Sequence, residues 1–245
     1  FGAPIFVKHQ IVHNKYVVDE LEKKGVIFIE EINEVPEHSI LIYSAHGVSE
    51  KIIKQSNDKK LKIFDATCPL VTKVHMEVVK LSKKNINTIL IGHKSHPEVE
   101  GTIGRYISES TSKIILIEKK EDVENLEFNT NEDVAYVTQT TLSIDDTKDI
   151  IDAIKSRFTN VKEPNKNDIC YATTNRQKAV KEIAAKCDYF LVIGSPNSSN
   201  SLRLVEVAEN YGAKNCILIE NINEVETSFF NNAVSIGITA SASAP

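Results

Sequence analysis

The chain has 245 residues and carries 29 Lys and Arg against 34 Asp and Glu, which gives a formal net charge of −5 at pH 7. No basic cluster is interleaved with aromatic residues, so we expect no nucleic-acid partner. The apolar runs are short, such as residues 190–193, whereas a membrane-spanning helix needs roughly 18 consecutive apolar residues. We therefore expect a soluble globular protein with no membrane partner.

The chain begins at Phe1 without an initiator Met and ends at Pro245, so we interpret it as a piece of a longer protein. Its four cysteines lie far apart and form no C-x-x-C pair. In a chain of this size, that spacing argues against a secreted disulfide framework and against a zinc ribbon. It favours a reducing compartment.

Short β-branched runs alternate with charged amphipathic stretches along the chain. Continuous apolar strands alternating with helices are typical of parallel sheets covered on both faces, so the predicted fold class is α/β. The pattern also repeats. A strand with its following polar turn recurs at residues 27–35, 115–123 and 217–225, and a further strand with a polar loop follows at residues 40–47, 134–141 and 234–241.

Cysteine-bearing segments continue the first two modules, at residues 63–68 and 168–174, and each leads into a predicted helix. The third module stops before such a segment. We predict three similar small α/β domains, residues 1–80, 81–186 and 187–245, the first lacking its lead-in and the last incomplete at its C-terminus. The alternative is that all doubly wound folds resemble one another at this level of similarity.

Polar side chains gather near the ends of the predicted strands, where ligands bind in open α/β sheets. They are His13, His46, Cys68, His96, Glu98, Thr140, Cys170, Ser198, Ser199, Asn200 and Ser243. Most precede a predicted helix, whose first N–H groups favour an anion such as a phosphate or diphosphate. Few of these loops offer Lys or Arg, so neutral donors and histidine would hold it. Taken singly, His13 and His46 are more readily loop or capping residues, and we expect His75 at a helix surface.

The segment His96-Pro97-Glu98 follows a predicted strand. Proline fixes the backbone between an imidazole and a carboxylate, so Glu98 could act as an acid tuned by His96. Equally, Pro97 and Glu98 suit the first turn of a helix. The hydroxyl and amide cluster at residues 195–201 likewise supplies an N-cap, with more polar groups than capping requires. No G-x-S-x-G, Walker A or G-x-G-x-x-G motif is present, which disfavours a serine hydrolase, a P-loop enzyme and a nicotinamide dehydrogenase.

Two of the cysteines, Cys68 and Cys170, occupy equivalent strand ends in two repeats, whereas Cys187 and Cys216 suit small buried core residues. Thiolates at equivalent strand ends would suit an iron–sulfur cluster. Two ligands are too few, so a third is expected from beyond one end of the chain. Burial of Cys68 and Cys170 as simple core residues is the alternative.

Taken together, several segments resemble the 4-hydroxy-3-methylbut-2-enyl diphosphate reductase (IspH/LytB) family of the methylerythritol phosphate pathway. The segments that carry the resemblance are residues 11–18, 44–48, 65–75, 92–101, 138–143, 170–177, 197–201 and 239–245. The resemblance runs from end to end. It implies three similar α/β domains arranged pseudo-threefold around a central pocket that holds a [4Fe–4S] cluster with one iron open to substrate.

The resemblance also implies the reaction, a two-electron, two-proton reductive dehydroxylation that gives isopentenyl and dimethylallyl diphosphates. By this resemblance Cys68 and Cys170 are cluster ligands, Glu98 delivers a proton, and His96 and Thr140 orient the substrate. The residues that would bind the diphosphate are His13, His46, Ser198, Ser199, Asn200 and Ser243. The family's first cluster cysteine would precede Phe1, so we expect the full protein to be active and this piece alone to be inactive.

Two other functions stay open from the residues alone: a catalytically silent module that binds a small phosphate ligand, and a zinc protein using Cys68, Cys170 and one histidine. The family implies ferredoxin or flavodoxin as the electron donor. The abundance of Lys, Asn and Ile suggests an AT-rich genome. We expect the plastid (apicoplast) stroma of a eukaryotic parasite, with the bacterial cytoplasm as the alternative.

Overall fold

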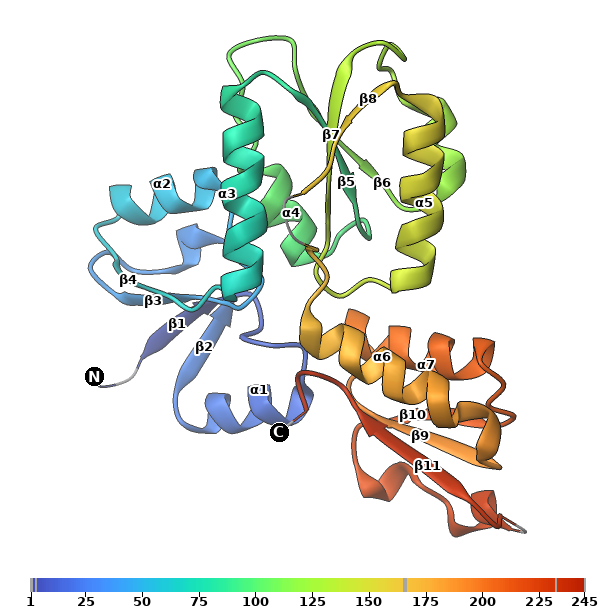
Figure 1. The fold of residues 1–245 in the computed structure, drawn as a ribbon. Helices are drawn as coiled ribbons and strands as arrows, with labels where there is room; N and C mark the ends of the chain where they lie inside the picture. The colour runs from blue at the N-terminus through green and yellow to red at the C-terminus, as the bar shows by residue number, and fades with distance from the viewer. Residues whose placement is uncertain (1, 3, 165–166, 232, 245) are drawn as a thin grey trace. The chain divides into compact units, whose positions relative to one another are not determined.

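The computed structural model describes residues 2, 4–164, 167–231 and 233–244; Phe1 and Pro245, the chain ends noted above, lie outside this set. The described residues form three sheets in which every strand pair is parallel. The predicted α/β class is therefore confirmed (Figure 1). Within the described part of the chain, each helix is too short or too polar to cross a membrane.

The first sheet has the strand order β2-β1-β3-β4. Its strands are β1 (Ile5–Lys8), β2 (Val26–Ile29), β3 (Ile40–Tyr43) and β4 (Lys62–Asp65). The helices in this part of the chain are α1 (Lys15–Lys23), the 3₁₀ helix η1 (Ile32–Glu34), α2 (Glu50–Asp58) and α3 (Pro69–Lys83). Ser49 begins α2 as its N-cap by accepting a hydrogen bond from the Ile52 N–H, which satisfies one of the helix's unpaired donors.

The second sheet has the equivalent order β6-β5-β7-β8. Its strands are β5 (Asn87–Ile91), β6 (Ile114–Ile117), β7 (Asp133–Thr138) and β8 (Asn160–Lys162), and its helices are α4 (Pro97–Ile103), η2 (Lys120–Asn125) and α5 (Ile144–Arg157). Apolar residues of α3 recur at helical spacing, at Val74, Val78 and Leu81, and pack against Leu90 and Val137 of this sheet. Figure 1 shows α3 and α4 on one side of this sheet and α5 on the other.

The third sheet has the order β10-β9-β11. Its strands are β9 (Tyr189–Ile193), β10 (Cys216–Ile219) and β11 (Ile236–Ala240), and its helices are α6 (Tyr171–Ile183), η3 (Ala184–Lys186), α7 (Ser199–Asn210), η4 (Ile222–Glu224) and η5 (Thr227–Phe230). Its core joins Val180 of α6 and Leu204 of α7 to Phe190 of β9.

The predicted repeat corresponds to equivalent elements in the three sheets. The recurring strands at residues 27–30, 115–118 and 217–220 are β2, β6 and β10, and each is followed by a 3₁₀ helix. A carboxylate within that short helix accepts a backbone N–H just after the strand: Glu34 from Glu31, Asp122 from Glu118, and Glu224 from Glu220. An acidic side chain thus makes an equivalent hydrogen bond after the equivalent strand in all three sheets. The domain boundaries at residues 80 and 186 stay predictions.

Contacts between residues divide the chain into two compact units. Unit 1 contains the first two sheets and ends at Asp168, and unit 2 contains the third sheet and the residues from Ile169 onward. Two short segments, Val12–Glu20 and Thr141–Ser143, also group with unit 2. His13 therefore belongs to the same unit as Ser198 and Ser243, although it precedes them by most of the chain.

The expected surface position of His75 is wrong, because this residue is buried in α3. Gly47 makes room for its ring. A Cβ at Gly47, whose φ is +73°, would lie 2.5 Å from His75 Cε1, which is too close for a real contact. The pKa of His75 is lowered to about 4, mainly by burial and to a smaller extent by the positive charge of Arg105. The ring is therefore neutral at pH 7.

Candidate functional site

Glu98 and Thr140 form a buried hydrogen-bonded pair in unit 1. Glu98 lies in the first turn of α4, and Thr140 lies two residues beyond the end of β7. The Thr140 N–H donates to Glu98 Oε1 at 2.7 Å, and Thr140 Oγ1 donates to Glu98 Oε2 at 3.0 Å. Only 3% of Glu98 is exposed. The pair holds the carboxyl group in one orientation at the carboxyl-terminal edge of the sheet.

Burial raises the pKa of Glu98 to about 7, and the negative charge of Asp168 adds to this rise, while the two hydrogen bonds from Thr140 oppose it. Burial dominates because a carboxylate loses its hydration there. A carboxyl group whose pKa lies near neutrality can hold a proton at pH 7 and still release it readily. Glu98 therefore has the acidity that a proton donor requires.

Two histidines adjoin this pair. His96 is the N-cap of α4, and its Nδ1 accepts the Glu98 N–H at 3.1 Å. The ring of His46 packs edge-on against the ring of His96 with centroids 5.6 Å apart, and Ser44 Oγ lies 3.3 Å from His46 Nδ1. His96-Pro97-Glu98 therefore does begin the helix, as the capping interpretation predicted. The acid interpretation stays open as well, because the cap uses the Glu98 N–H and the Glu98 carboxyl group bonds to Thr140.

Cys68 lies next to this group in unit 1. It is the N-cap residue of α3, and its thiol makes no capping bond to any residue the structure describes. Its backbone N–H donates to the carbonyl of Ala45 at 3.0 Å, which ties it to the loop that carries His46. Cys68 is a partly exposed free thiol. The start of a helix favours negative charge, and the thiolate is the ligating form of cysteine.

In unit 2, Cys170 occupies the same position with respect to its helix. It is the N-cap residue of α6, again with no side-chain capping bond among the described residues, and it is a partly exposed free thiol. By contrast, the Cys187 thiol donates to the carbonyl of Ile183, and Cys216 packs in the core, where burial raises its pKa to about 11. All four thiols are free and partly buried, so the predicted division into two ligands and two core residues stays a prediction.

The thiols of Cys68 and Cys170 fit an iron–sulfur cluster as thiolate ligands, because each projects from a helix start without another role. Within the described ranges, no three His, Cys, Asp or Glu side chains converge as ligands for a metal ion.

The N-terminus of α7 gathers the predicted anion-binding side chains of unit 2. Ser198 is the N-cap and accepts the Ser201 N–H at 3.4 Å, while Ser199 Oγ lies 3.1 Å from Thr141 Oγ1. Asn200 is 4% exposed, and neither its amide nitrogen nor its amide oxygen finds a partner among the described residues. Because buried polar atoms are normally hydrogen-bonded, Asn200 indicates a bound ligand or water at this place.

Ser243 and His13 meet in the same unit. Ser243 Oγ donates to the His13 carbonyl at 3.0 Å and lies 2.9 Å from Ser241 Oγ. A cavity of about 590 Å³ lies at the carboxyl ends of the three strands, lined by Asn14, Gly194, Ser195 and Ala240 among others. Its lining includes the carboxylates of Asp19, Glu220 and Glu224, and not the predicted diphosphate-binding residues of this unit.

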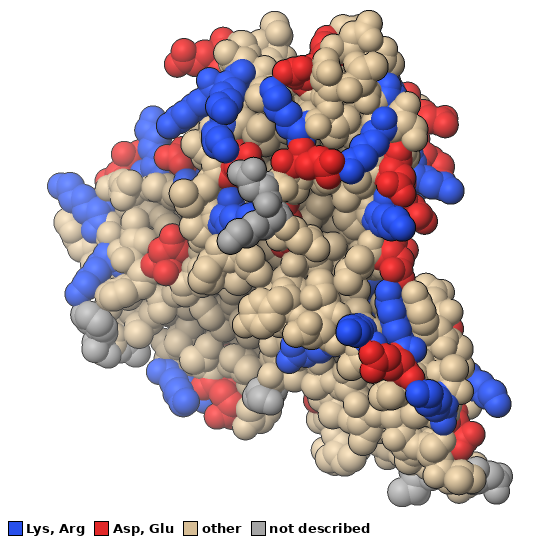
Figure 2. Space-filling view, viewed as in Figure 1, with Lys and Arg blue, Asp and Glu red and all other residues tan. Residues whose placement is uncertain are grey.

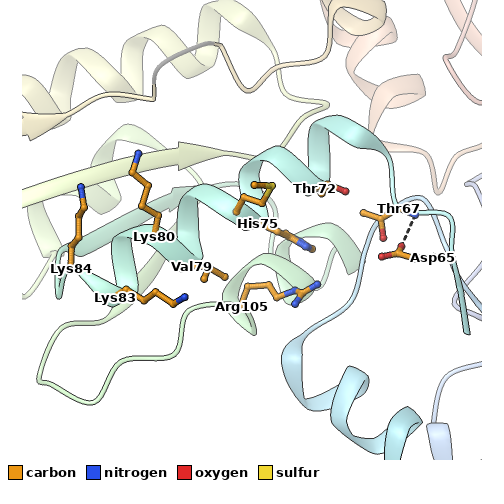
Figure 3. Close-up of a pocket in the computed structure, with 10 residues that line it drawn as sticks. Asp65, Thr67, Thr72, His75, Val79, Lys80, Lys83, Lys84 and Arg105 are labelled. Atoms are coloured by element: carbon orange, nitrogen blue, oxygen red, sulfur yellow. Dashed lines mark hydrogen bonds between the residues drawn. The ribbon is translucent and has the colours of Figure 1, made fainter. Parts of the chain in front are cut away.

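A second cavity of about 590 Å³ lies in unit 1, and Thr67, the neighbour of Cys68, is among its lining residues. It runs along α3 and is lined by His75, Val79, Lys83 and Arg105 among others (Figure 3). Arg105 donates to Glu50 at 2.7 Å. On the face seen in Figure 2, Lys and Arg side chains lie among Asp and Glu side chains.

The sequence interpretation gave no role to Lys73 and Asp168. Asp168 is 2% exposed and forms an ion pair with Lys73 at 3.0 Å. The available signal was a single acidic residue just before a candidate ligand, in Asp168-Ile169-Cys170. A carboxylate among apolar neighbours needs a partner, but its partner lies 95 positions away.

Comparison with known proteins identifies the family. The family model described as LytB protein matches residues 1–245. Proteins named 4-hydroxy-3-methylbut-2-enyl diphosphate reductase from Acinetobacter baumannii and Pseudomonas aeruginosa are each 54% identical over 245 residues, all of this chain, and 77% and 78% of their own lengths.

Solved structures agree. The structure of E-1-hydroxy-2-methyl-but-2-enyl-4-diphosphate reductase from Plasmodium falciparum matches all of this chain and 76% of its own, with a TM-score of 0.95 at 43% identity. A structure of (E)-4-hydroxy-3-methyl-but-2-enyl diphosphate reductase matches 98% of this chain and 83% of its own, with a TM-score of 0.66 at 34% identity. The chain therefore belongs to the LytB protein family.

Proposed function

We propose that this protein is a reductase that converts (E)-4-hydroxy-3-methylbut-2-enyl diphosphate to isopentenyl and dimethylallyl diphosphates. The observation that carries the proposal is Glu98, a buried carboxyl group held by Thr140, with a pKa near neutrality. Reductive removal of a hydroxyl group needs such an acid, because the leaving oxygen departs as water only after protonation. Membership of a family whose relatives carry this enzyme name supports it.

The reaction consumes two electrons and two protons, breaks the bond between C4 and its hydroxyl oxygen, and releases one water. Cys68 and Cys170 would hold a [4Fe–4S] cluster together with a third cysteine, and the cluster when bound would supply the electrons and an open iron position near the hydroxyl group. In unit 1, Glu98 donates a proton, and Thr140 fixes the carboxyl group through both of its oxygens. His96 and Thr140 orient the substrate beside Glu98.

The diphosphate is bound by neutral donors. We assign this role to His46 in unit 1 and, in unit 2, to the hydroxyl and amide groups at the start of α7 with their neighbours His13 and Ser243. The α7 residues are Ser198, Ser199 and Asn200. The unpartnered amide of Asn200 supports this role, since a diphosphate oxygen would accept its N–H groups. The positive end of the helix dipole supports it as well.

The electron donor and the compartment belong to the same proposal. We propose ferredoxin or flavodoxin as the donor, as the family resemblance implies. The chain is 54% identical to the bacterial relatives and 43% identical to the Plasmodium falciparum protein. This difference favours the bacterial alternative over the apicoplast that the sequence interpretation put first, and an AT-rich bacterial genome accounts equally well for the Lys, Asn and Ile content.

The decisive experiment is anaerobic purification of the protein at its full natural length, followed by iron, sulfide and zinc analysis and a turnover assay with a chemical reductant. We expect iron and sulfide together with formation of both diphosphate products. Diphosphate binding without iron or sulfide would favour the silent module, and zinc without sulfide would favour the zinc protein. Either result would overturn the proposal.

A further inference from the structure

A single buried carboxylate, Asp168, connects three segments of unit 1. Its Oδ1 accepts from Lys73 Nζ at 3.0 Å, and its Oδ2 accepts the Thr138 N–H at 3.1 Å. Lys73 Nζ also donates to the Asn167 carbonyl at 3.1 Å. Both carboxylate oxygens are therefore engaged, and one ammonium group binds two successive residues of the chain. This arrangement fixes both the position and the orientation of Asp168.

Each of these segments leads directly to a residue of the proposed site. Lys73 lies in the second turn of α3, the helix that begins after Cys68. Thr138 is the last residue of β7, two positions before Thr140. Asp168 itself is the last residue of unit 1 and lies two positions before Cys170. Fixing Asp168 thus fixes the strand end that carries Thr140 and the point from which the chain leaves unit 1 toward Cys170.

We infer that Asp168 is a positioning residue for the proposed reaction: through Lys73 and the Thr138 N–H, it aligns the strand end that presents Thr140 to Glu98 with the helix that begins at Cys68. The effect on the reaction rests on the proposed function, but the hydrogen bonds of Asp168 can be tested without substrate. Asp168 touches neither Glu98 nor a thiol by any hydrogen bond described above, so it acts through its neighbours.

Electrostatics gives Asp168 a second effect on the same pair. Its negative charge contributes to the raised pKa of Glu98, for which burial is the main cause. Asp168 lies in the loop between β8 and α6. Of the titratable neighbours of Glu98, His96 precedes it as the N-cap of its own helix, and His46 adjoins His96. Lys73 partly offsets the charge of Asp168. Removing the carboxylate or the ammonium should therefore shift the pKa of Glu98 in different directions.

The first test is hydrogen exchange of the Thr138 and Thr140 amides in Asp168→Asn. This variant keeps the shape of the side chain but removes the charge, so we expect the Thr138 amide to exchange about tenfold faster or more. If Asp168 positions the strand end, exchange of the Thr140 amide must also accelerate, because its bond to Glu98 depends on that alignment. Acceleration confined to Thr138 would overturn the inference.

The second test compares the titration of the Glu98 carboxyl group, followed by carbon NMR, in Asp168→Asn and Lys73→Gln. We expect the pKa of Glu98 to fall in Asp168→Asn and not to fall in Lys73→Gln, whereas simple loosening of the structure would move it in the same direction in both. Lys73→Arg should restore the parent titration and the parent exchange rates. The control is Asp133→Asn, which removes the carboxylate of an exposed pair with Lys162.

If Asp168→Asn fails to fold, Lys73→Gln and Lys73→Arg are compared with the parent protein in the same two measurements. In that case, Thr140 exchange unchanged in Lys73→Gln would overturn the inference. Both measurements need neither substrate nor turnover. Failure of the inference therefore appears as unchanged Thr140 exchange in an active protein, and failure of the proposed function appears as absent turnover in the unsubstituted protein.

Discussion

Units 1 and 2 present a cysteine in the same way but surround it with different chemistry. Cys68 and Cys170 are each the N-cap residue of a helix, and neither thiol makes a capping hydrogen bond to a described residue. Around Cys68, unit 1 places a buried acid and two histidines, whereas unit 2 carries hydroxyl and amide groups at the start of α7. Both units thus place a cysteine before a helix, and under the proposed function we expect unit 1 to handle the proton and unit 2 to make most of the contacts to the anion.

The variant with the largest expected effect is Glu98→Gln. Glutamine keeps the size of the side chain but cannot deliver a proton, so we expect turnover to fall by about 10²–10⁴-fold. Diphosphate affinity, which we assign mainly to unit 2, should change little. The matched control is Glu100→Gln, an exposed residue of the same helix. Comparable losses in affinity and in turnover for Glu98→Gln would contradict the division.

The pH dependence of turnover tests the same group without substitution. Burial raises the pKa of Glu98 to about 7, so the acid form is lost above that pH and the rate should fall about tenfold per pH unit. The stability follows with a definite sign. The unfolded carboxyl group ionises near its ordinary pKa, so the folded state binds the extra proton, and stability should decline as pH rises from about 4.5 to 7. Glu98→Gln should flatten that decline in thermal unfolding.

For unit 2, the informative change is Asn200→Ala. If the buried amide awaits a diphosphate oxygen, its removal should weaken inorganic diphosphate binding by about 10- to 150-fold, since a hydrogen bond to a charged group contributes about 1.5–3 kcal/mol. The unliganded protein should not lose stability, because the amide has no partner there among the described residues. Calorimetric titration measures both proteins, with Asn210→Ala at the exposed end of the same helix as control. Unchanged affinity would argue against a binding role for Asn200.

A smaller effect distinguishes the packing of the two units. Gly47→Ala and Gly212→Ala both place a side chain at a positive φ, +73° and +97°, which costs roughly 1 kcal/mol at either position. At Gly47 the new Cβ would also lie 2.5 Å from His75 Cε1, whereas at Gly212 the nearest atom is Ala185 Cβ at 3.2 Å. We therefore expect Gly47→Ala to lower the denaturation midpoint more than Gly212→Ala. Equal shifts would mean that the His75 ring moves freely.

Local sequence patterns were sufficient for much of this protein. Alternation of apolar runs with amphipathic stretches predicted the α/β class, and the recurring strand and turn located β2, β6 and β10. The repeat also led to the prediction, still to be tested, that Cys68 and Cys170 are ligands and that Cys187 and Cys216 are not. These features depend on neighbours within one or two elements, where periodicity and turn chemistry are informative.

Features that depend on distant segments did not follow from such patterns. His75 occupies an amphipathic helix and was expected at the surface, but the room for its ring comes from Gly47 on another segment. The ion pair of Lys73 with Asp168 joins residues 95 positions apart. No local signal marks which charged residue will be buried, since burial depends on what packs over it.

The sequence by itself determined which residue types stand at the strand ends, and with them the family. Only the tertiary structure decided how they act. Glu98 becomes an acid with a pKa near neutrality because the fold removes it from water and places Thr140, 42 positions away, against its carboxyl group. Asn200 becomes an anion-binding candidate because the fold buries its amide without a partner within the described residues. Both properties arise from desolvation, which is a consequence of packing between segments far apart in the chain.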